Sequence, residues 1–274
     1  MIELPETYVL SDQISEKLVG KVIKTVAANT HPNGFAWYTG DPALYNDKLS
    51  GKKITGTAAY GGRPEIWAED MRISFCDGVN IRYLDAGEKR PPKHQLLVDF
   101  DDGTAMSCTV QMYGGIFVFP GGSKDDEYLN IAMEKPSPYS DEFNESYFEC
   151  LRKDAKPSLS IKAFLATKQR IPGLGNGVLQ DILFNARIHP KRKLEDLTDN
   201  DATALFGSVK STLKQMWEQS GRDTEKDLFN RKGGYQTILS RNTIKHPCRV
   251  CSSELVRQAY LGGNIYFCPG CQLL

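Results

Sequence analysis

Four cysteines near the end of the chain constrain its fold more than any other feature. They form two Cys-x-x-Cys pairs, Cys248 with Cys251 and Cys268 with Cys271, separated by sixteen residues. Each pair can present two thiolates from a tight turn, and the intervening residues are long enough for a β-hairpin. A segment this short buries little core and depends on a bound metal for stability. The spacing predicts a structural four-cysteine zinc site; the alternatives are a pair of disulfides or a coincidental spacing.

Three further cysteines, Cys76, Cys108 and Cys150, are far apart and share no ligand spacing. We expect them to be reduced residues of a buried core. The chain opens with acidic residues instead of a secretion signal, and it has no run of about eighteen apolar residues that could span a membrane. We therefore expect a reducing, cytoplasmic compartment.

The formal net charge of zero hides an asymmetry between the two halves of the chain. Residues 1–150 carry 14 Lys and Arg against 23 Asp and Glu, a balance of −9. Residues 151–274 carry 20 against 11, a balance of +9. The basic half suggests a polyanionic partner, although surface charge can also segregate by chance. Beside a zinc ribbon, the asymmetry makes nucleic acid the leading partner.

The first 120 residues are predicted to form one helix followed by antiparallel strands. Leu10, Ile14 and Leu18 recur every four residues, which predicts an amphipathic helix over 6–19 that ends at Gly20. Short β-rich runs follow, and Asp-Gly pairs at 77–78 and 102–103 are strong hairpin turns between them. These runs cover residues 22–26, 72–75, 80–84, 96–100 and 116–119. The pattern is typical of an antiparallel β-sandwich or barrel.

A change of domain is indicated between residues 121 and 160, where glycines and prolines cluster. Beyond it the sequence predicts helices over 159–170, 176–187 and 201–219, with a further helical segment at 223–229. The predicted fold class is α+β. We expect three units, a β-sandwich domain over 1–135, a helical domain over 136–240 and the zinc-binding segment over 241–274.

A glycine-rich turn separates two of the predicted helices and reads Pro172-Gly173-Leu174-Gly175-Asn176. The second helix would begin near Asn176, so its first backbone N–H groups would be exposed. Such a helix end binds phosphate through its unpaired donors and its dipole, and the two glycines allow close approach. Considered alone, the motif could equally be an ordinary turn between helices.

Residues 162–190, which contain this turn, resemble the helix–two-turn–helix element of the formamidopyrimidine-DNA glycosylase and endonuclease VIII family. The opening Met1-Ile2-Glu3-Leu4-Pro5-Glu6 is similar to that family's Met-Pro-Glu-Leu-Pro-Glu start, and the segment ending in Cys271-Gln272 is similar to its zinc finger. The order of helix, β-sandwich, helical domain and zinc finger fits over essentially the whole chain. The resemblance implies a monomeric, nucleoid-associated base-excision enzyme that binds double-stranded DNA and flips out a damaged or abasic nucleotide.

The resemblance also implies a chemistry, with one departure. In the family the initiator methionine is removed, and the amine of a proline at position 2 attacks the sugar C1′ before base loss and strand cleavage. Here Ile2 predicts that Met1 is retained, so the terminal amine lies one residue, up to ~3.6 Å, from its family position. A displacement of that size can remove catalysis. Glu3 matches the family's proton shuttle, and its alternative role is a first-turn carboxylate that interacts with the helix dipole.

Several DNA-contacting positions of the family also differ. The finger arginine that grips a phosphate falls at Gly263 and Asn264. The wedge that fills the space left by a flipped base falls at Val79 and at Met112-Tyr113, for which strand-end packing is the alternative. The strand-cleaving lysine falls at Arg63, which can hold phosphate but transfers protons poorly. The full set of predicted DNA contacts is Asn176, Gly175, Lys162, Arg63, Met112, Tyr113, Arg241 and Asn264.

Two further segments have open roles. Residues 222–234 occupy the place of the family's mobile lesion-reading loop, and their charge also fits a solvated surface loop. Lys191, Arg192 and Lys193 form a solvated face or a secondary phosphate contact. The predicted function is a DNA N-glycosylase with weak strand cleavage, and the presence of Glu3 favours this enzymatic function. The rival is a non-catalytic protein that binds damaged DNA, which Ile2 and Gly263 favour; a zinc-ribbon adaptor without lesion specificity is the third reading.

Overall fold

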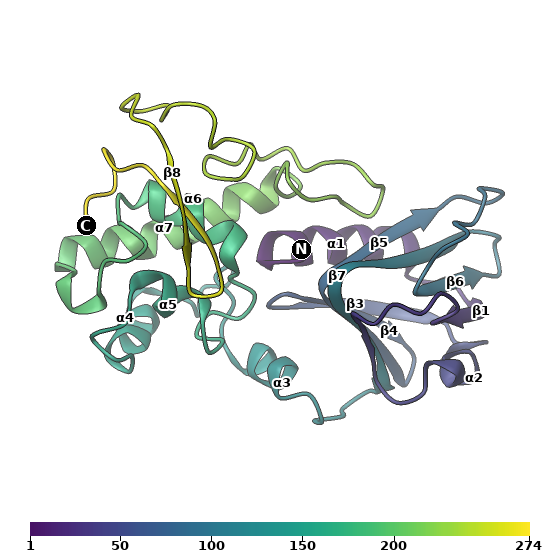
Figure 1. Cartoon of the computed structure of the whole chain (residues 1–274). Helices are drawn as coiled ribbons and strands as arrows, with labels where there is room; N and C mark the ends of the chain where they lie inside the picture. The colour runs from purple at the N-terminus through teal and green to yellow at the C-terminus, as the bar shows by residue number, and fades with distance from the viewer.

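The computed structural model describes residues 1–274 and has two lobes, a sheet lobe and a helical lobe (Figure 1). Helix α1 lies between the lobes, and a long connection through α3 joins them along one side. The sheet lobe comprises α1 (Leu4–Leu18), β1 (Ile23–Ala28), β2 (Ala36–Tyr38), η1 (Pro42–Leu44), α2 (Tyr45–Leu49), β3 (Ile54–Tyr60), β4 (Arg63–Ala68), β5 (Met71–Leu84), β6 (Leu96–Phe100) and β7 (Ala105–Pro120). The remainder comprises α3 (Glu127–Glu134), α4 (Glu145–Lys153), α5 (Ile161–Ala166), α6 (Asn176–Asn185), η2 (Leu194–Asp196), α7 (Asp199–Glu218), β8 (Val256–Tyr260) and β9 (Gly263–Phe267).

Helix α1 confirms the predicted amphipathic helix and begins two residues earlier than expected, at Leu4. Proline in its first turn has a backbone angle that suits a helix start. The periodic residues Leu10, Ile14 and Leu18 are all buried, and Gly20, with φ of +94°, follows the helix end. The helix packs against β3 and β4 on the sheet side and against α7 on the other, so it fixes one lobe relative to the other.

The strands form one sheet that closes on itself. Its order is β1-β6-β7-β5-β4-β3, with antiparallel neighbours throughout, and β2 adds to β7 in parallel. The two edges meet where Val22 bridges Lys53 and where the N–H of Ile23 donates to the carbonyl of Lys52. Side chains from both edges, such as Ile23 and Ile54, belong to the same buried core. The predicted antiparallel sandwich or barrel is therefore confirmed.

One of the two predicted hairpin turns is wrong. The chain does turn at Asp102-Gly103, between β6 and β7. At Asp77-Gly78, however, β5 continues as one strand, and the register shifts between Asp77 and Val79 to form a bulge. A Cβ on Gly78 would lie 2.7 Å from the carbonyl oxygen of Tyr113, so this glycine permits close contact between β5 and β7.

Helices α3 and α4 lie in the region 121–160, where no helix was predicted, and the predicted helices differ from the structure at two places. Helix α5 ends at Ala166 instead of residue 170, because Lys168 and Gln169 have positive φ angles of 55° and 48°. Residues 223–229 form no helix, since the Asp227 side chain accepts the N–H groups of Phe229 and Arg231 and holds a turn. Helices α6 and α7 start and end within two residues of the predicted limits.

The hairpin β8–β9 lies across α6 (Figure 1). Phe184 of α6 forms a small core with Ile238, Leu239, Cys248 and Cys268 from the segments that flank the hairpin, and Tyr266 of β9 packs against it; this core is separate from those of the two lobes. Cys76 and Cys108 are buried as expected, whereas Cys150 is exposed on α4, so that prediction is wrong for this residue. No helix combines the length and apolar character needed to cross a membrane.

Candidate functional site

The carboxylate of Glu3 lies at the junction of the two lobes. It extends from the start of α1 to the start of α6, where Oε1 accepts the N–H of Gly177 and Oε2 the N–H of Val178, each at 2.8 Å. A Cβ on Gly175 would lie 2.6 Å from the Glu3 Cδ atom. The glycines of the turn therefore make room for this carboxylate. The prediction of free donors at this helix end is wrong for these two N–H groups, because Glu3 already occupies them.

Arg222 is the charged partner of this carboxylate. Its Nη1 lies 3.4 Å from Oε2 of Glu3, while Nε and Nη2 donate to the two oxygens of Glu6 at 2.9 and 2.6 Å. Only 2% of Arg222 is exposed. Burial opposes its charge, but Glu3 and Glu6 outweigh burial and raise the pKa of the guanidinium above its ordinary value. Segment 222–234 is therefore anchored by a buried ion network, in contrast to the solvated loop that its composition suggested.

Burial raises the pKa of Glu3 above its ordinary value, although Arg222 and the two α6 N–H groups oppose the rise. The desolvated carboxyl holds a proton more readily than an exposed glutamate does. Such a group suits proton transfer near neutral pH. The structure therefore places at the lobe junction a carboxyl that can exchange protons with a bound molecule.

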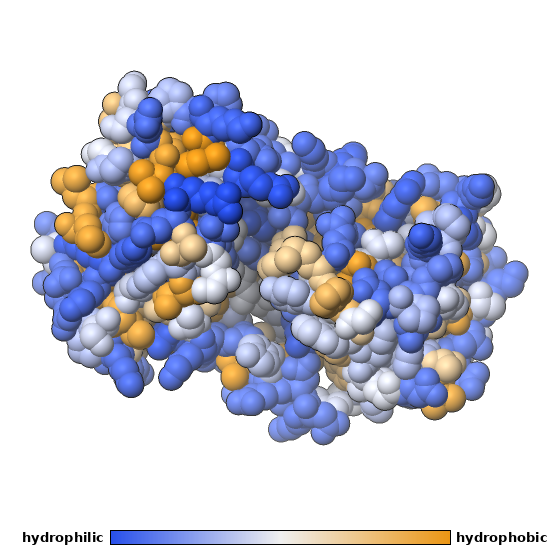
Figure 2. Space-filling model, viewed as in Figure 1, coloured by the Kyte–Doolittle hydropathy of each residue, from blue (hydrophilic) through white to orange (hydrophobic).

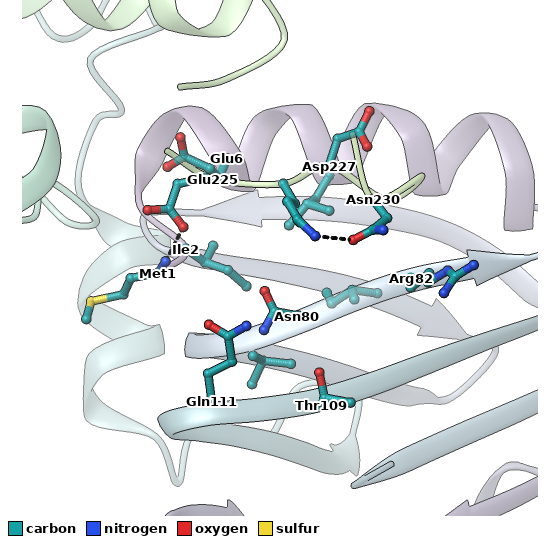
Figure 3. Close-up of a pocket in the computed structure, with 14 residues that line it drawn as sticks. Met1, Ile2, Glu6, Asn80, Arg82, Thr109, Gln111, Glu225, Asp227 and Asn230 are labelled. Atoms are coloured by element: carbon teal, nitrogen blue, oxygen red, sulfur yellow. Dashed lines mark hydrogen bonds and ion pairs between the residues drawn. The ribbon is translucent and has the colours of Figure 1, made fainter. Parts of the chain in front are cut away.

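The chain terminus is held beside Glu3 by a different set of contacts. The N–H of Ile2 donates to the carbonyl of Asp77 at 2.7 Å, and the Ile2 side chain is buried in the sheet core. The terminal ammonium of Met1 pairs with the carboxylate of Glu225. Figure 3 shows the amine directed toward Glu225 and the thioether pointing away from the pocket. The amine is therefore occupied by an ion pair from segment 222–234.

Two cavities share Met1 and Ile2 in their walls. The larger, of about 540 Å³, is lined by Glu3, Arg63 and the glycine-rich turn, and it lies between the lobes. The smaller, of about 140 Å³, is lined by Gln111 and by Glu225 with its neighbours, as Figure 3 shows. A hollow between the lobes is visible on the surface in Figure 2. A bound group in the larger cavity could reach Glu3, whereas the Met1 amine is paired on the side of the smaller one.

Arg63 lines the larger cavity but already has a partner. Its Nη1 lies 2.8 Å from Oδ2 of Asp126, and its guanidinium lies over the ring of Phe117, 4.9 Å from the centroid. An anion entering the cleft would have to compete with Asp126 for this charge. The acidic partner precedes α3, which links the lobes, and nothing in the sequence indicated the pairing.

The structure brings together three of the predicted DNA contacts, Asn176, Lys162 and Asn264. Nδ2 of Asn176 donates to the carbonyl of Asn264 at 2.8 Å, and Nζ of Lys162 donates to the carbonyl of Tyr260 at 2.6 Å. The Oδ1 atom of Asn176 is buried without a hydrogen-bond partner. Burial lowers the pKa of Lys162. A Cβ on Gly263 would lie 3.7 Å from Nζ of Lys162, so α5 supplies a cation where the hairpin has no arginine.

The remaining predicted residues lie apart from this junction. Val79, which stands at one wedge position of the family, is 3% exposed in the sheet core and is not available as a wedge. Met112 and Tyr113 are exposed on β7, which rules out ordinary core packing for them. Arg241 is exposed in the segment before the cysteines. Arg222 and Glu225 could not be recognised as site residues from the sequence, because buried charged residues have the same sequence signal as solvated ones.

The four cysteines come together at the base of the hairpin. Their Sγ atoms all lie within 4.8 Å of one another; Cys251 and Cys268 are 3.3 Å apart, and Cys248 and Cys271 are 3.8 Å apart. Four sulfurs around a tetrahedral zinc ion lie about 3.8 Å apart, given Zn–S bonds of about 2.3 Å. All four thiols are free, and these separations exceed the roughly 2.05 Å of a disulfide. The cluster has the donor set and spacing of a closed structural metal site.

Known proteins resemble this chain in sequence, both in the helical region and over the whole length. A family profile described as the formamidopyrimidine-DNA glycosylase H2TH domain matches residues 135–227. The chain is 28% identical to the formamidopyrimidine-DNA glycosylase of Wolbachia sp. subsp. Brugia malayi over 99% of this chain and all of the relative. It is 26% identical to that of Cytobacillus firmus, with both chains covered completely.

Solved structures share the fold. The complex of Lactococcus lactis Fpg with DNA containing an abasic site superposes with a TM-score of 0.85 at 23% identity. MutM in complex with DNA containing carbocyclic 8-oxo-G has a TM-score of 0.84 at 23% identity. Each covers 99% of this chain and all of the other. The element order, the helix–two-turn–helix match and the four-cysteine cluster agree with these likenesses, so the chain shares the fold of the Fpg structures and is similar in sequence to formamidopyrimidine-DNA glycosylases over its whole length.

Proposed function

We propose that this protein is a base-excision DNA glycosylase that binds duplex DNA at a damaged or abasic nucleotide and removes the modified base. The observation that carries the proposal is the Glu3 carboxyl, buried at the lobe junction with a raised pKa and facing the 540 Å³ cleft. The relatives are named formamidopyrimidine-DNA glycosylases, and the structural neighbours hold DNA with abasic or oxidised nucleotides. These names support oxidised and ring-opened purines as the substrate class.

In the proposed reaction, Glu3 activates a water molecule in the cleft. The carboxylate accepts a proton from the water, the water oxygen bonds to the sugar C1′, and the bond from C1′ to the base nitrogen breaks so that the base leaves with its electron pair. The two N–H groups of α6 fix the direction of the carboxylate, and Arg222 balances its charge. The proton that Glu3 gains can then pass to the departing base.

The terminal amine makes a weak contribution in this proposal. An ammonium has no free electron pair, so this group must leave its contact with Glu225 and lose a proton before it can attack C1′. The Ile2 N–H is held by Asp77, which fixes the terminus one residue from the position that the family uses. Strand cleavage through an amine intermediate should therefore be slow, and Met1 is the weaker of the two catalytic candidates.

DNA is proposed to contact both lobes. The basic balance of residues 151–274 and the meeting of Lys162, Asn176 and Asn264 support a phosphate site where α6 faces the hairpin. Gly175, Arg63, Met112, Tyr113 and Arg241 complete the proposed contact set. The four cysteines are proposed to hold a zinc ion that keeps the hairpin folded. We also propose that the chain divides into three units, residues 1–135, 136–240 and 241–274.

The test compares excision and binding in the wild type and Glu3→Gln. Duplexes carry 8-oxo-guanine, a formamidopyrimidine, an abasic analogue or no lesion. We expect base release by the wild type and a loss of at least about a hundredfold in Glu3→Gln. Affinity for the abasic duplex should stay within a few-fold, because no phosphate contact is removed. Gln retains only one of the two acceptor oxygens, so thermal unfolding of each variant serves as the folding control.

Two outcomes separate this function from its rival. Full excision by folded Glu3→Gln would place the catalytic carboxyl elsewhere. No excision of any lesion by the wild type, together with tight and selective binding of the abasic duplex, would identify a non-catalytic damage-binding protein.

A further inference from the structure

Four large apolar side chains are exposed together on the sheet lobe. Phe35 is 64% exposed, Trp37 50%, Met112 62% and Tyr113 40%. The rings of Trp37 and Tyr113 lie 5.9 Å apart with an angle of 34° between their planes. Single exposed apolar residues are common, but several on two paired segments, with two of the rings in contact, indicate an interaction site. We call these four residues the aromatic shelf.

The shelf is held in a fixed position by backbone contacts. Strand β2 pairs in parallel with β7, and Trp37 lies beside Gly115 in this register. The N–H of Gly114 donates to the carbonyl of Phe35 at 3.0 Å, and Nδ2 of Asn33 donates to the carbonyl of Val110 at 3.0 Å. Two segments distant in sequence are therefore joined, so the exposed rings lie on a rigid support.

The two residues of β7 that pair with Ala36 and Trp37 are Gly114 and Gly115, which have no side chains to cover the indole. A Cβ on Gly114 would lie 2.9 Å from Val79, and one on Gly115 would lie 2.1 Å from the ring of Phe117. A side chain at either position would require its neighbours to move, and the indole of Trp37 remains half-exposed and open to a partner.

The location of the shelf determines what can cover it. Trp37 lines the 540 Å³ cleft together with Glu3 and Arg63. Figure 2 shows apolar side chains on the sheet lobe next to the hollow between the lobes. The shelf is thus continuous with the cleft proposed to receive DNA. Flat aromatic rings beside such a cleft fit the faces of nucleic-acid bases, which stack on them with little dependence on sequence.

We propose that Trp37 stacks on a base that is left unstacked when the target nucleotide leaves the duplex, with Phe35 extending the same surface. This inference rests on the proposed function. It assigns a base contact to segment 33–38, in which sequence reasoning placed no functional residue. Val79 stands at a wedge position of the family but is buried. The shelf can supply the missing apolar surface from a different strand.

The experiment measures affinity for an abasic duplex and for the same duplex without a lesion, in the wild type, Trp37→Ala, Trp37→Phe and Leu44→Ala. Leu44 is 48% exposed on the same lobe and lines neither cavity, so it controls for loss of apolar surface. We expect Trp37→Ala to weaken abasic binding by about thirtyfold, the middle of the range for stacking on one base. Trp37→Phe should retain most of the affinity, and Leu44→Ala and all affinities for intact duplex should be unchanged.

Tryptophan fluorescence gives a second readout that a purely structural role would not change. Stacking on a base should quench the indole, so abasic DNA should quench wild-type emission, and the quenching should disappear in Trp37→Phe. Equal abasic affinity for wild type and folded Trp37→Ala, with quenching retained in Trp37→Phe, would overturn the stacking proposal and leave the glycosylase proposal intact. Equal wild-type affinity for abasic and intact duplex would overturn both.

Discussion

At the scale of single residues, the pairing of Met1 with Glu225 leads to a specific prediction. Glu225→Gln removes the negative partner of the terminal ammonium while keeping the size of the side chain. More of the amine is then free to attack C1′ of abasic DNA, so borohydride should trap several-fold more covalent protein–DNA adduct. Glu16→Gln, a change on the exposed surface of α1, is the matched control and should leave trapping unchanged. Equal trapping by wild type and Glu225→Gln would show that the ion pair does not restrain the amine.

Residue chemistry was only partly predictable from the sequence. Glu3 could be identified because it belongs to a short motif at the chain start. Its contact with the first N–H groups of α6 could not, since that contact joins segments about 174 residues apart. Arg222 was missed because a charged residue in a charged segment has no distinguishing pattern. Only the fold reveals that Glu3 and Glu6 enclose it.

At the scale of elements, the cysteine cluster should determine whether the hairpin folds. Cys268→Ser should release the proposed zinc ion, unfold β8–β9 and weaken DNA binding, because the core of the hairpin is small. The sheet lobe should remain folded, since its core is separate. Metal analysis, hydrogen exchange and DNA affinity together check this. Cys150→Ser changes an exposed cysteine outside the cluster and should retain metal and affinity. A hairpin protected equally in both variants would contradict the assignment.

The link between α6 and the segment before the cysteines predicts a pH effect on stability. Asp181 accepts the N–H groups of Ile238 and Leu239 at 2.8 Å each, and burial raises its pKa to about 6. The unfolded chain releases this proton near pH 3.8, so between about pH 4 and 6 the folded protein binds a proton that the unfolded chain does not. The free energy of unfolding should therefore fall as pH rises through this range, by on the order of 3 kcal/mol, and level off above it.

Urea unfolding of wild type and Asp181→Asn from pH 4 to 7 tests this effect. Asn cannot titrate, so the stability difference between wild type and variant should shrink as pH rises toward 6. Contributions from other carboxyl groups are common to both proteins and cancel. A difference that is constant with pH would show that Asp181 titrates normally in the folded state.

Elements with a strong local pattern were predicted correctly, and those determined by distant contacts were not. The four-residue spacing of Leu10, Ile14 and Leu18 was sufficient for α1, and the Asp102-Gly103 pair for one hairpin. At Asp77-Gly78 the same dipeptide lies in a bulge, because β7 pairs with both sides of it. The helical pattern at 223–229 failed because Asp227 caps a turn with its own side chain.

At the scale of the whole molecule, the position of α1 and the charge distribution support the proposal that DNA binds between the two lobes. The acidic and basic halves of the chain correspond closely to the sheet and helical lobes, and Glu3 lies where they meet. The sequence predicted this asymmetry, and the resemblance implied a cleft between the domains, but not which residues of the two lobes form its walls. The proposed excision chemistry therefore depends on the relative placement of the lobes, which α1 and the Arg222 network maintain.

The central claim is that excision depends on Glu3 and does not require the Met1 amine. The most direct test is a single-turnover reaction of the wild type with a duplex carrying one formamidopyrimidine, in which released base and borohydride-trapped adduct are measured in the same sample. Intact mass confirms whether Met1 is present. The account predicts base release with adduct amounting to only a small fraction of turnovers. Trapped adduct equal to the released base would contradict it, because the amine would then be the attacking group despite its pairing with Glu225.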